Sequence, residues 1–239
     1  TLLDTILRSN SKINVVEEQG MLWAAKSFLR QNGHNDFVTE LIPPQLNIGA
    51  QKIYRREFNK YVDTSLADKE YIDKLPLNLL QLPLINQLYP DAKFILALRH
   101  PMDTILSCWM QYFKLNSAMA NMVELDRIVD FYCIAMETFK ICRTNYNLNV
   151  HEIRYEDLIN NFRKESETVV HFLNLQWEPE MENYQNTAIK RGQINTPSYS
   201  QVVQPIYKDA QFRWLNYRKQ LEQYLDQVKP WISEFGYSL

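Results

Sequence analysis

The sequence predicts an α/β fold built on a parallel sheet, and three observations support this prediction. The run Lys93–Leu98 is continuously apolar after its lysine, which is typical of a strand buried on both faces of a parallel sheet. Short strand-like segments alternate with helix-like segments along the chain. The 239 residues, 46% of them hydrophobic, suffice for one hydrophobic core. We therefore expect a single domain over residues 1–239.

Periodicity predicts the individual elements. A helix is expected over Thr1–Arg8, with Thr1 as its N-cap and Asp4 at the third helical position, where a carboxylate completes a capping box. Further helices are expected at Gln19–Arg30, at Ile48–Tyr61, from Pro101 onwards and at Leu125–Thr144. Strands are expected at Ile13–Val16, Lys93–Leu98 and Asn149–Arg154.

The sequence opens on a helix, with neither an initiator methionine nor a leading strand. A helix normally follows a loop, so we expect an upstream strand and loop to be missing before Thr1. A natural N-terminal helix exposed by processing is the alternative.

Composition excludes several classes of protein. The net charge of −2 gives no strong field toward nucleic acid or an anionic membrane. The cysteines Cys108, Cys133 and Cys142 are odd in number and lack metal-ligand spacing, so neither a disulfide framework nor a zinc site is expected, and a reducing, cytoplasmic compartment is favoured. No apolar stretch has the length of a membrane span.

The strongest chemical signal is the passage from the strand Lys93–Leu98 into the next helix. The strand delivers Arg99 to the edge of the sheet, and the helix presents Ser107 about two turns later, leaning back toward its own N-terminus. An arginine, a hydroxyl and a helix N-terminus together make a phosphate site. The alternative is that Arg99 only pairs with Asp103 at the helix start.

Three weaker signals accompany it. Lys74 stands before Leu75-Pro76 and is by itself most often a surface residue. Glu18, in the Glu17-Glu18 step after the first strand, is either a general base or an exposed strand-end residue. The polar segment 191–201, which contains Ser198, is either a plain loop or a lid over a cleft.

Several segments together resemble bacterial sulfotransferases, of the type linked to tetratricopeptide repeats and related to tyrosylprotein sulfotransferases. They are Phe94–Trp109, the Tyr155-Glu156-Asp157-Leu158 step, and 201–207 followed by Trp214. The likeness covers nearly the whole chain, although each motif is short. It implies a three-layer fold like that of P-loop NTPases, with a central parallel sheet and the chance of an upstream repeat domain.

In that family a Pro-Arg-Ser-Gly-Thr-Thr loop holds the 5′-phosphosulfate of the donor PAPS, and Leu-Leu-x-x-Ile-Leu follows. Leu2–Leu7 matches the continuation, so the resemblance makes Thr1 the last threonine of the loop. It also implies that the first strand and the rest of the loop are missing. It further assigns Arg99 and Ser107 to the 3′-phosphate, and Tyr155 and Ser198 to the nucleotide.

The resemblance implies that Glu18 is the catalytic base and that Lys74 stabilises the leaving phosphate, with no metal. The acceptor would be a hydroxyl or phenol on a small molecule or peptide. Related tyrosylprotein enzymes carry a lysine where this chain has Gln204, so Gln204 receives no phosphate role. A nucleotide kinase of the P-loop class, or a non-catalytic nucleotide-binding fragment, remain the alternatives. The aromatic residues of the Ile48–Tyr61 helix either border the acceptor pocket or pack in the core.

Overall fold

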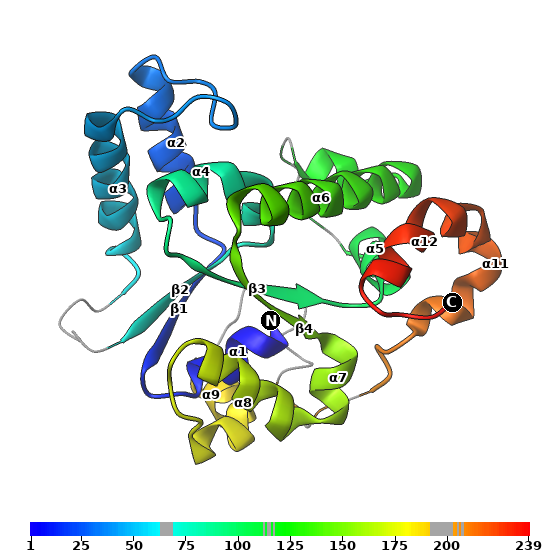
Figure 1. Ribbon diagram of the computed structural model, residues 1–239. Coiled ribbons are helices and arrows are strands. Elements are labelled where there is room, and N and C mark those ends of the chain that lie inside the picture. Colours follow the sequence, from blue (N-terminus) through cyan, green and yellow to red (C-terminus); the bar gives the residue numbers. More distant parts are fainter. Residues whose placement is uncertain are drawn as a thin grey trace.

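The computed structural model describes residues 1–62, 69–111, 113, 116, 118–191, 203–204, 206 and 208–239 (Figure 1). Within these ranges four strands alternate with helices: β1 (Ile13–Glu17), β2 (Glu70–Lys74), β3 (Lys93–Leu98) and β4 (Asn149–Arg154). The α/β class predicted from the sequence is confirmed.

The α-helices are α1 (Leu2–Arg8), α2 (Met21–Gln31), α3 (Pro44–Phe58), α4 (Leu82–Leu88), α5 (Pro101–Trp109), α6 (Leu125–Tyr146), α7 (Tyr155–Asn160), α8 (Phe162–Phe172), α9 (Tyr184–Arg191), α11 (Arg218–Leu221) and α12 (Leu225–Glu234). Short 3-10 helices are η1 (Pro76–Gln81), η2 (Met119–Met122), η3 (Pro179–Asn183), η4 (Arg213–Tyr217) and η5 (Glu222–Tyr224).

The strands form two parallel pairs. β1 pairs with β2, with Glu17 opposite Lys74, and β3 pairs with β4, with Leu98 opposite Arg154. The sequence predicts one central sheet, whereas the described residues form two hydrogen-bonded pairs that lie within one layer. Ile72 of β2 and Ile95 of β3 pack against the same hydrophobic cluster, which holds the two pairs side by side.

The expectation that β3 is buried on both faces is only partly met and needs correction. Leu98 is buried, but Ala97 is exposed and the residues from Phe94 to Leu96 are half-buried. The physical reason is that, among the described residues, β3 has a strand partner only in β4. One edge and part of one face of β3 therefore lack the cover that a strand in the middle of a sheet receives.

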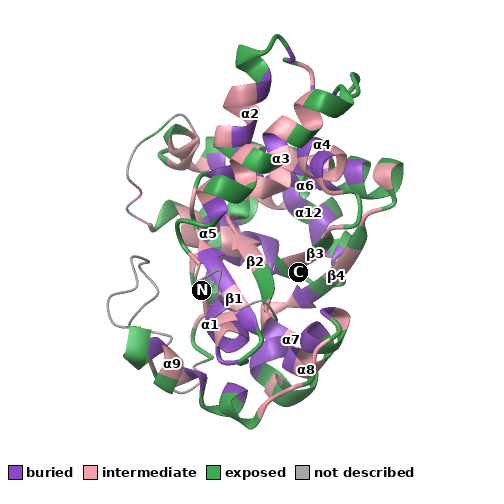
Figure 2. Ribbon diagram, turned by 90° about the vertical axis from the view of Figure 1, so that its left-hand side faces the viewer, coloured by how far each residue is buried: buried purple, intermediate pink, exposed green. Residues whose placement is uncertain are grey.

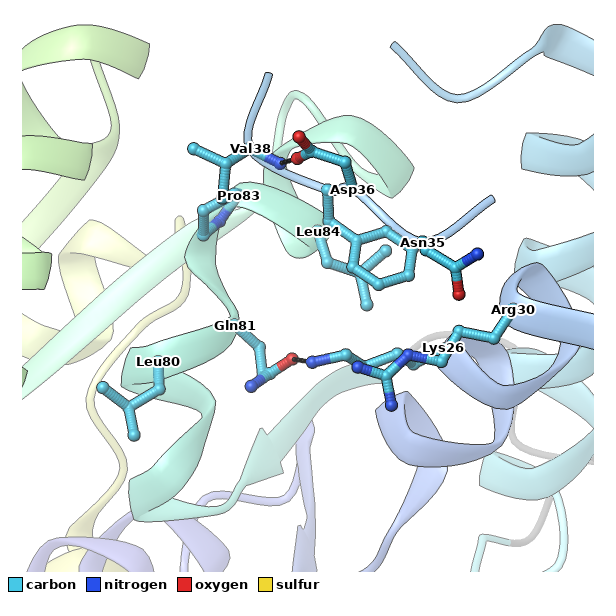
Figure 3. A pocket seen from close by; sticks show the side chains of 10 residues that line it. Lys26, Arg30, Asn35, Asp36, Val38, Leu80, Gln81, Pro83 and Leu84 are labelled. Atoms are coloured by element: carbon cyan, nitrogen blue, oxygen red, sulfur yellow. Dashed lines mark hydrogen bonds between the residues drawn. The ribbon is translucent and has the colours of Figure 1, made fainter. Parts of the chain in front are cut away.

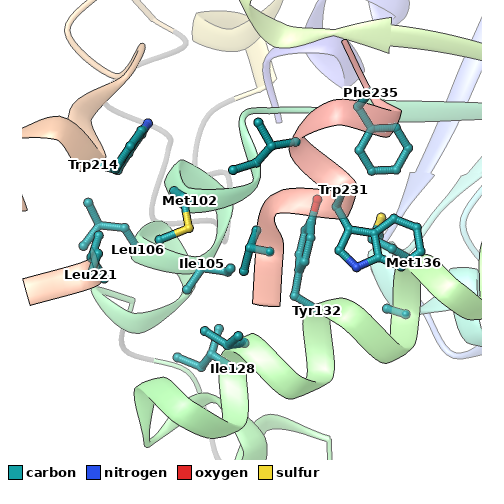
Figure 4. Close-up of a cluster of buried hydrophobic side chains, with 14 of the residues drawn as sticks. Met102, Ile105, Leu106, Ile128, Tyr132, Met136, Trp214, Leu221, Trp231 and Phe235 are labelled. Carbon is teal, nitrogen blue, oxygen red and sulfur yellow. The ribbon is translucent and has the colours of Figure 1, made fainter. Parts of the chain in front are cut away.

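Helices cover the strands from two sides, which gives the expected three layers (Figure 1). On one side α1, α8 and η3 build a cluster with Val15 and Ile153. On the other side α5, α6 and α12 pack together beneath Leu98, and Figure 4 shows their side chains pointing toward one another. In Figure 2 the buried residues gather around the strands and on the inner faces of these helices. In the described ranges, no helix has both the length and the apolarity that crossing a membrane requires.

Helices α2 and α3 lie in close contact at Gly49. A methyl group placed on Gly49 would lie 2.6 Å from Cζ of Phe28, well inside van der Waals contact. Leu22, Leu29 and Ala50 are buried in the same contact. The absence of a side chain at position 49 thus lets the ring of Phe28 fit between the two helices.

The start of α1 differs from the prediction. Thr1 is the N-cap residue, but its side chain makes no capping hydrogen bond, so the predicted capping box is wrong. The carboxylate of Asp4 contacts two arginines. Its Oδ1 accepts a hydrogen bond from Nε of Arg8 at 2.6 Å, and its Oδ2 lies 3.7 Å from Arg191.

Candidate functional site

Each of the four strands ends at a residue with a polar or charged side chain that the sequence had marked. Glu18 follows β1, Lys74 ends β2, Arg99 follows β3 and Tyr155 follows the end of β4. In α/β proteins, ligands bind beyond the carboxyl ends of the strands. The structure therefore places the predicted residues where the fold class puts a ligand.

Glu18 and Lys74 meet directly. Nζ of Lys74 lies 2.9 Å from Oε1 of Glu18, and the backbone N–H of Glu18 donates to the carbonyl of Lys74 at 2.7 Å. The amino nitrogen of Thr1 lies within electrostatic reach of both side chains. The reading of Lys74 as a surface residue is wrong, because its position in β2 leaves only 22% of the side chain exposed.

Glu18 has a backbone conformation that suits a functional residue. Its φ is 54°, in the left-handed region that non-glycine residues rarely occupy. This sharp turn ends β1 and directs the carboxylate out of the strand, where 47% of the side chain is exposed. Such a conformation costs on the order of 1 kcal/mol and persists only where the surroundings enforce it.

Sequence reasoning missed the importance of Glu17. Its carboxylate binds two cations, with Nζ of Lys74 at 2.8 Å from Oε1 and Nη2 of Arg191 at 2.6 Å from Oε2. Although burial opposes the charge, the hydrogen bonds from Lys74 and Arg191 lower the pKa of Glu17 to about 2. Glu17 is therefore a fixed anion that holds Lys74 in place.

Lys74 remains a firm cation in this setting. Burial favours its neutral form, but the hydrogen bonds and charges of Glu17 and Glu18 outweigh that effect and raise its pKa. An ammonium group held beside a partly exposed carboxylate can stabilise negative charge on a ligand while the carboxylate acts on a proton.

A second group of residues surrounds Arg99. Nη2 of Arg99 donates to the carbonyl of Ala210, and its guanidinium lies 5.5 Å from the centre of the Tyr155 ring. The ion pair with Asp103 is long, at 4.0 Å, because Oδ1 of Asp103 accepts a hydrogen bond from the backbone of Trp214 at 2.8 Å. The simple Arg99–Asp103 pairing is thus not the main contact of either residue.

Arg99 keeps capacity for an anion. Its Nε is buried and has no hydrogen-bond partner among the described residues. Ser107 lies half-buried on α5. Burial raises the pKa of the thiol of its neighbour Cys108, and the charge of Arg99 opposes that rise. Ser198 lies outside the described residues.

The loop that bears Arg99 is fixed from below by a buried cluster. Glu156 accepts hydrogen bonds from the backbone N–H of His100 at 2.9 Å and from the hydroxyl of Tyr237 at 2.7 Å. The His100 ring stacks on Trp214 with a centroid distance of 5.1 Å, and its Nδ1 accepts from the N–H of Met102. Arg99 therefore projects from a rigid base.

Helix α9 connects the two groups. Its first residue is Tyr184. Burial, and next the charge of the nearby Tyr155, raise the pKa of Tyr184. At its last residue, Arg191 binds Glu17. Since a helix rises 1.5 Å per residue, the seven steps of α9 span roughly 10 Å. Within the described ranges, no cluster of His, Cys, Asp and Glu has the makings of a metal site.

The three-layer architecture and the polar strand ends define an α/β protein with a candidate ligand site at the carboxyl edge of its strands. Its fold is that of sulfotransferases: the solved sulfotransferase domain from the curacin biosynthetic pathway superposes with a TM-score of 0.63, covering 100% of this chain and 93% of that one at 16% identity. The sequence profile of the Sulfotransferase family matches residues 1–179, and the chain belongs to this family.

Two curated relatives match part of the chain. A putative protein-tyrosine sulfotransferase of Caenorhabditis briggsae is 27% identical over 168 residues, which is 69% of this chain and 59% of the relative. An uncharacterized protein of Aquifex aeolicus (strain VF5) is 25% identical over 180 residues, covering 72% of this chain and 23% of the relative. The chain thus spans less than two thirds of the length of either relative.

Proposed function

We propose that this protein transfers a sulfuryl group from PAPS to a hydroxyl or phenol, and that residues 1–239 act as one domain in doing so. The observation that carries the proposal is the pairing of Glu18 with Lys74 at 2.9 Å, beside a separate arginine site at Arg99. Membership of the sulfotransferase family and the sulfotransferase fold support the reaction class.

The described residues fit a donor with two anionic ends. Arg99 has an unused buried Nε, and Ser107 lies on the helix that follows it, so these residues would hold the 3′-phosphate. Tyr155, whose ring lies beside the Arg99 guanidinium, would contact the nucleotide. Thr1 and Lys74 lie at the other group and would hold the end that carries the sulfuryl group.

The reaction needs proton removal at one point and charge stabilisation at another. As the acceptor oxygen forms its bond to sulfur, Glu18 takes the proton of that oxygen. The bond between sulfur and the bridging phosphate oxygen breaks, and Lys74 stabilises the negative charge left on that oxygen. Glu17 stays ionised throughout, because two cations already bind it, and so keeps the ammonium of Lys74 in position.

The experiment that tests the proposal combines binding and transfer in the full-length protein. We expect Glu18→Gln to lower the transfer rate by about 10²–10⁴-fold, the usual contribution of a general base, without changing the affinity for PAP. We expect Arg99→Ala to cost on the order of 2–5 kcal/mol of PAP binding, as for a buried charged contact. Arg127→Ala, which removes an exposed arginine of α6, is the control.

Equal binding of ATP and PAP would favour the kinase-like alternative. PAP binding with normal affinity but no transfer to any hydroxyl would favour a non-catalytic nucleotide-binding protein. Unchanged transfer by Glu18→Gln would overturn the role of Glu18 as the base.

A further inference from the structure

A cavity of about 420 Å³ lies between α2, the segment after it, η1 and the start of α4 (Figure 3). None of its lining residues belongs to the Glu18–Lys74 or Arg99 groups. Its volume falls in the range of small-molecule sites. Its walls are Lys26 and Arg30 on α2, Asn35, Asp36, Phe37 and Val38 after it, and Leu80, Gln81, Pro83 and Leu84 opposite.

Two cations at the cavity, Lys26 and Arg30, have no ion-pair partner among the residues that the structure describes. Lys26 donates to Oε1 of Gln81 at 2.8 Å and lies 5.4 Å from the Phe37 ring centre, and both partners are neutral. Neither Lys26 nor Arg30 forms an ion pair within the part of the chain that the structure describes. Burial, and next the charge of Arg30, lower the pKa of Lys26, as expected for two neighbouring cations without a counter-ion.

The carboxylate of Asp36 also lines the cavity, but among the described residues it forms no ion pair with Lys26 or Arg30 and is instead hydrogen-bonded within its own segment. Oδ1 of Asp36 accepts hydrogen bonds from the backbone N–H groups of Val38 at 2.8 Å and Thr39 at 2.9 Å. Its Oδ2 accepts from the hydroxyl of Thr39. With Lys26 and Arg30 positive and Asp36 negative, the charged side chains of the lining leave one net positive charge, and both cations lie on the wall formed by α2.

The rest of the lining is largely apolar. Leu80, Pro83 and Leu84 face the cations from η1 and α4 (Figure 3). Phe37 and Val38 also line the cavity. A ligand that fits this cavity must present an apolar body to these residues and a negative group to Lys26 and Arg30.

Chain connectivity links two walls of the cavity to the Glu18–Lys74 pair. Helix α2 begins three residues after Glu18, and η1 begins two residues after Lys74, so both walls lead away from the pair. Trp23, Lys26 and Arg30 are spaced three and four residues apart and share one stripe of α2. Trp23 is 72% exposed and stands at the end of this stripe nearest to Glu18.

We infer that this cavity binds the far end of the sulfuryl acceptor, and that the acceptor is a small amphipathic hydroxyl compound carrying a carboxylate. The inference rests on the proposed function, because the acceptor hydroxyl must reach Glu18. Lys26 and Arg30 bind the carboxylate, the apolar wall binds the body of the molecule, and Trp23 lines the way to Glu18.

The test measures direct binding by calorimetry in the full-length protein. The probes are hydroxyphenylpropionate and its uncharged amide, which have the same phenol and nearly the same shape. We expect the carboxylate to bind roughly tenfold more tightly than the amide, because a wall with two cations and a net positive lining favours an anion. Lys26→Gln and Arg30→Gln should each remove most of this preference and leave the amide affinity unchanged, which also shows that the variants are folded.

Lys52→Gln, which removes an exposed lysine from α3, is the matched control and should retain the full preference. Equal binding of the two probes, or a preference that survives both substitutions on α2, would overturn the inference. PAP affinity, measured on the same samples, separates this result from the donor proposal. PAP binding without a carboxylate preference refutes the cavity assignment alone, and a carboxylate preference without PAP binding refutes the donor assignment alone.

Discussion

At the scale of single residues, Glu17 fixes the positions of two charged side chains in the site. Its two oxygens bind Lys74 and Arg191, so a single carboxylate joins β1, β2 and the end of α9. Glu18, one residue later, is more exposed, and its ion pair among the described residues is with Lys74. One acidic residue thus supports the structure while its neighbour stays accessible for chemistry.

Glu17 also makes stability depend on pH. Its pKa of about 2 in the folded protein lies below its ordinary value of 4.5. The stabilisation is therefore complete above pH 4.5 and is lost as the pH falls toward 2, by on the order of 1–3 kcal/mol. We expect urea unfolding of the wild type to show this loss and Glu17→Gln to show a flatter profile. Glu180→Gln, at an exposed position, should follow the wild type, and a Glu17→Gln profile as steep as the wild type would refute the assignment.

The sequence could reveal some of these residues and not others. Glu18, Lys74 and Arg99 stand beside strand ends or within recognisable motifs, so pattern and family resemblance both select them. The role of Glu17 depends on the register that puts it opposite Lys74. The role of Arg191 depends on how α9 packs, 174 residues away in the chain. The local spacing of residues predicts neither the contact of Glu17 with Lys74 nor its contact with Arg191.

At the scale of elements, the α2–α3 contact supports the wall that carries Trp23, Lys26 and Arg30. Gly49 lets the two helices approach until the Phe28 ring fills the space where a side chain would begin. Any change that separates these helices would also move the cations of the cavity.

We expect Gly49→Ala to destabilise the protein by about 1–2 kcal/mol. Overpacking costs roughly 1–3 kcal/mol, and the better helix propensity of alanine returns only about 1 kcal/mol. Phe28→Leu should relieve the clash, so the double variant Gly49→Ala/Phe28→Leu should be more stable than the sum of the single effects predicts. Thermal or urea unfolding measures all three, and strict additivity would show that the contact with Phe28 is not the cause.

Two strands were predicted to the residue, the helices were predicted with shifted ends, and one strand was missed. Lys93–Leu98 and Asn149–Arg154 have the predicted bounds, because apolar runs or alternation mark them clearly. β2 was not predicted, since its sequence Glu-Tyr-Ile-Asp-Lys has charges at both ends and two adjacent apolar residues in place of an alternating pattern. Its strand conformation comes from pairing with β1, a long-range contact that a local window does not contain.

At the scale of the whole molecule, the last described segment closes the fold around the Arg99 loop. After α12 the chain returns to the ends of β3 and β4, where Tyr237 donates to Glu156 and Arg154 donates to the carbonyl of Gly236. The carbonyl of Ser238 lies 3.3 Å from Nε2 of His100. Distant parts of the sequence thus meet under the candidate donor site.

We expect Tyr237→Phe to lower the free energy of unfolding by about 1–3 kcal/mol, because it leaves the buried carboxylate of Glu156 short of one donor. PAP affinity should fall as well, since Glu156 also anchors the backbone of His100 next to Arg99.

Tyr224→Phe is the matched control. Its hydroxyl donates to Asp126 at the same 2.7 Å, but on the surface, so its removal should change stability by no more than roughly 0.5 kcal/mol. Equal effects of the two substitutions in urea unfolding would contradict the role of the buried cluster.

The support of Arg99 by Ala210 and of His100 by Ser238 has a consequence for the newly made protein. These partners are 111 and 138 residues apart in sequence, so Arg99 and His100 emerge from the ribosome long before Ala210 and Ser238. Until the later residues emerge, the Arg99 loop lacks its base and the apolar faces of α5 and α6 lack α12. Chains halted by a premature stop within this interval would expose that surface and be substrates for chaperones or proteases, so nucleotide binding would be gained only after Ser238 has emerged from the ribosome.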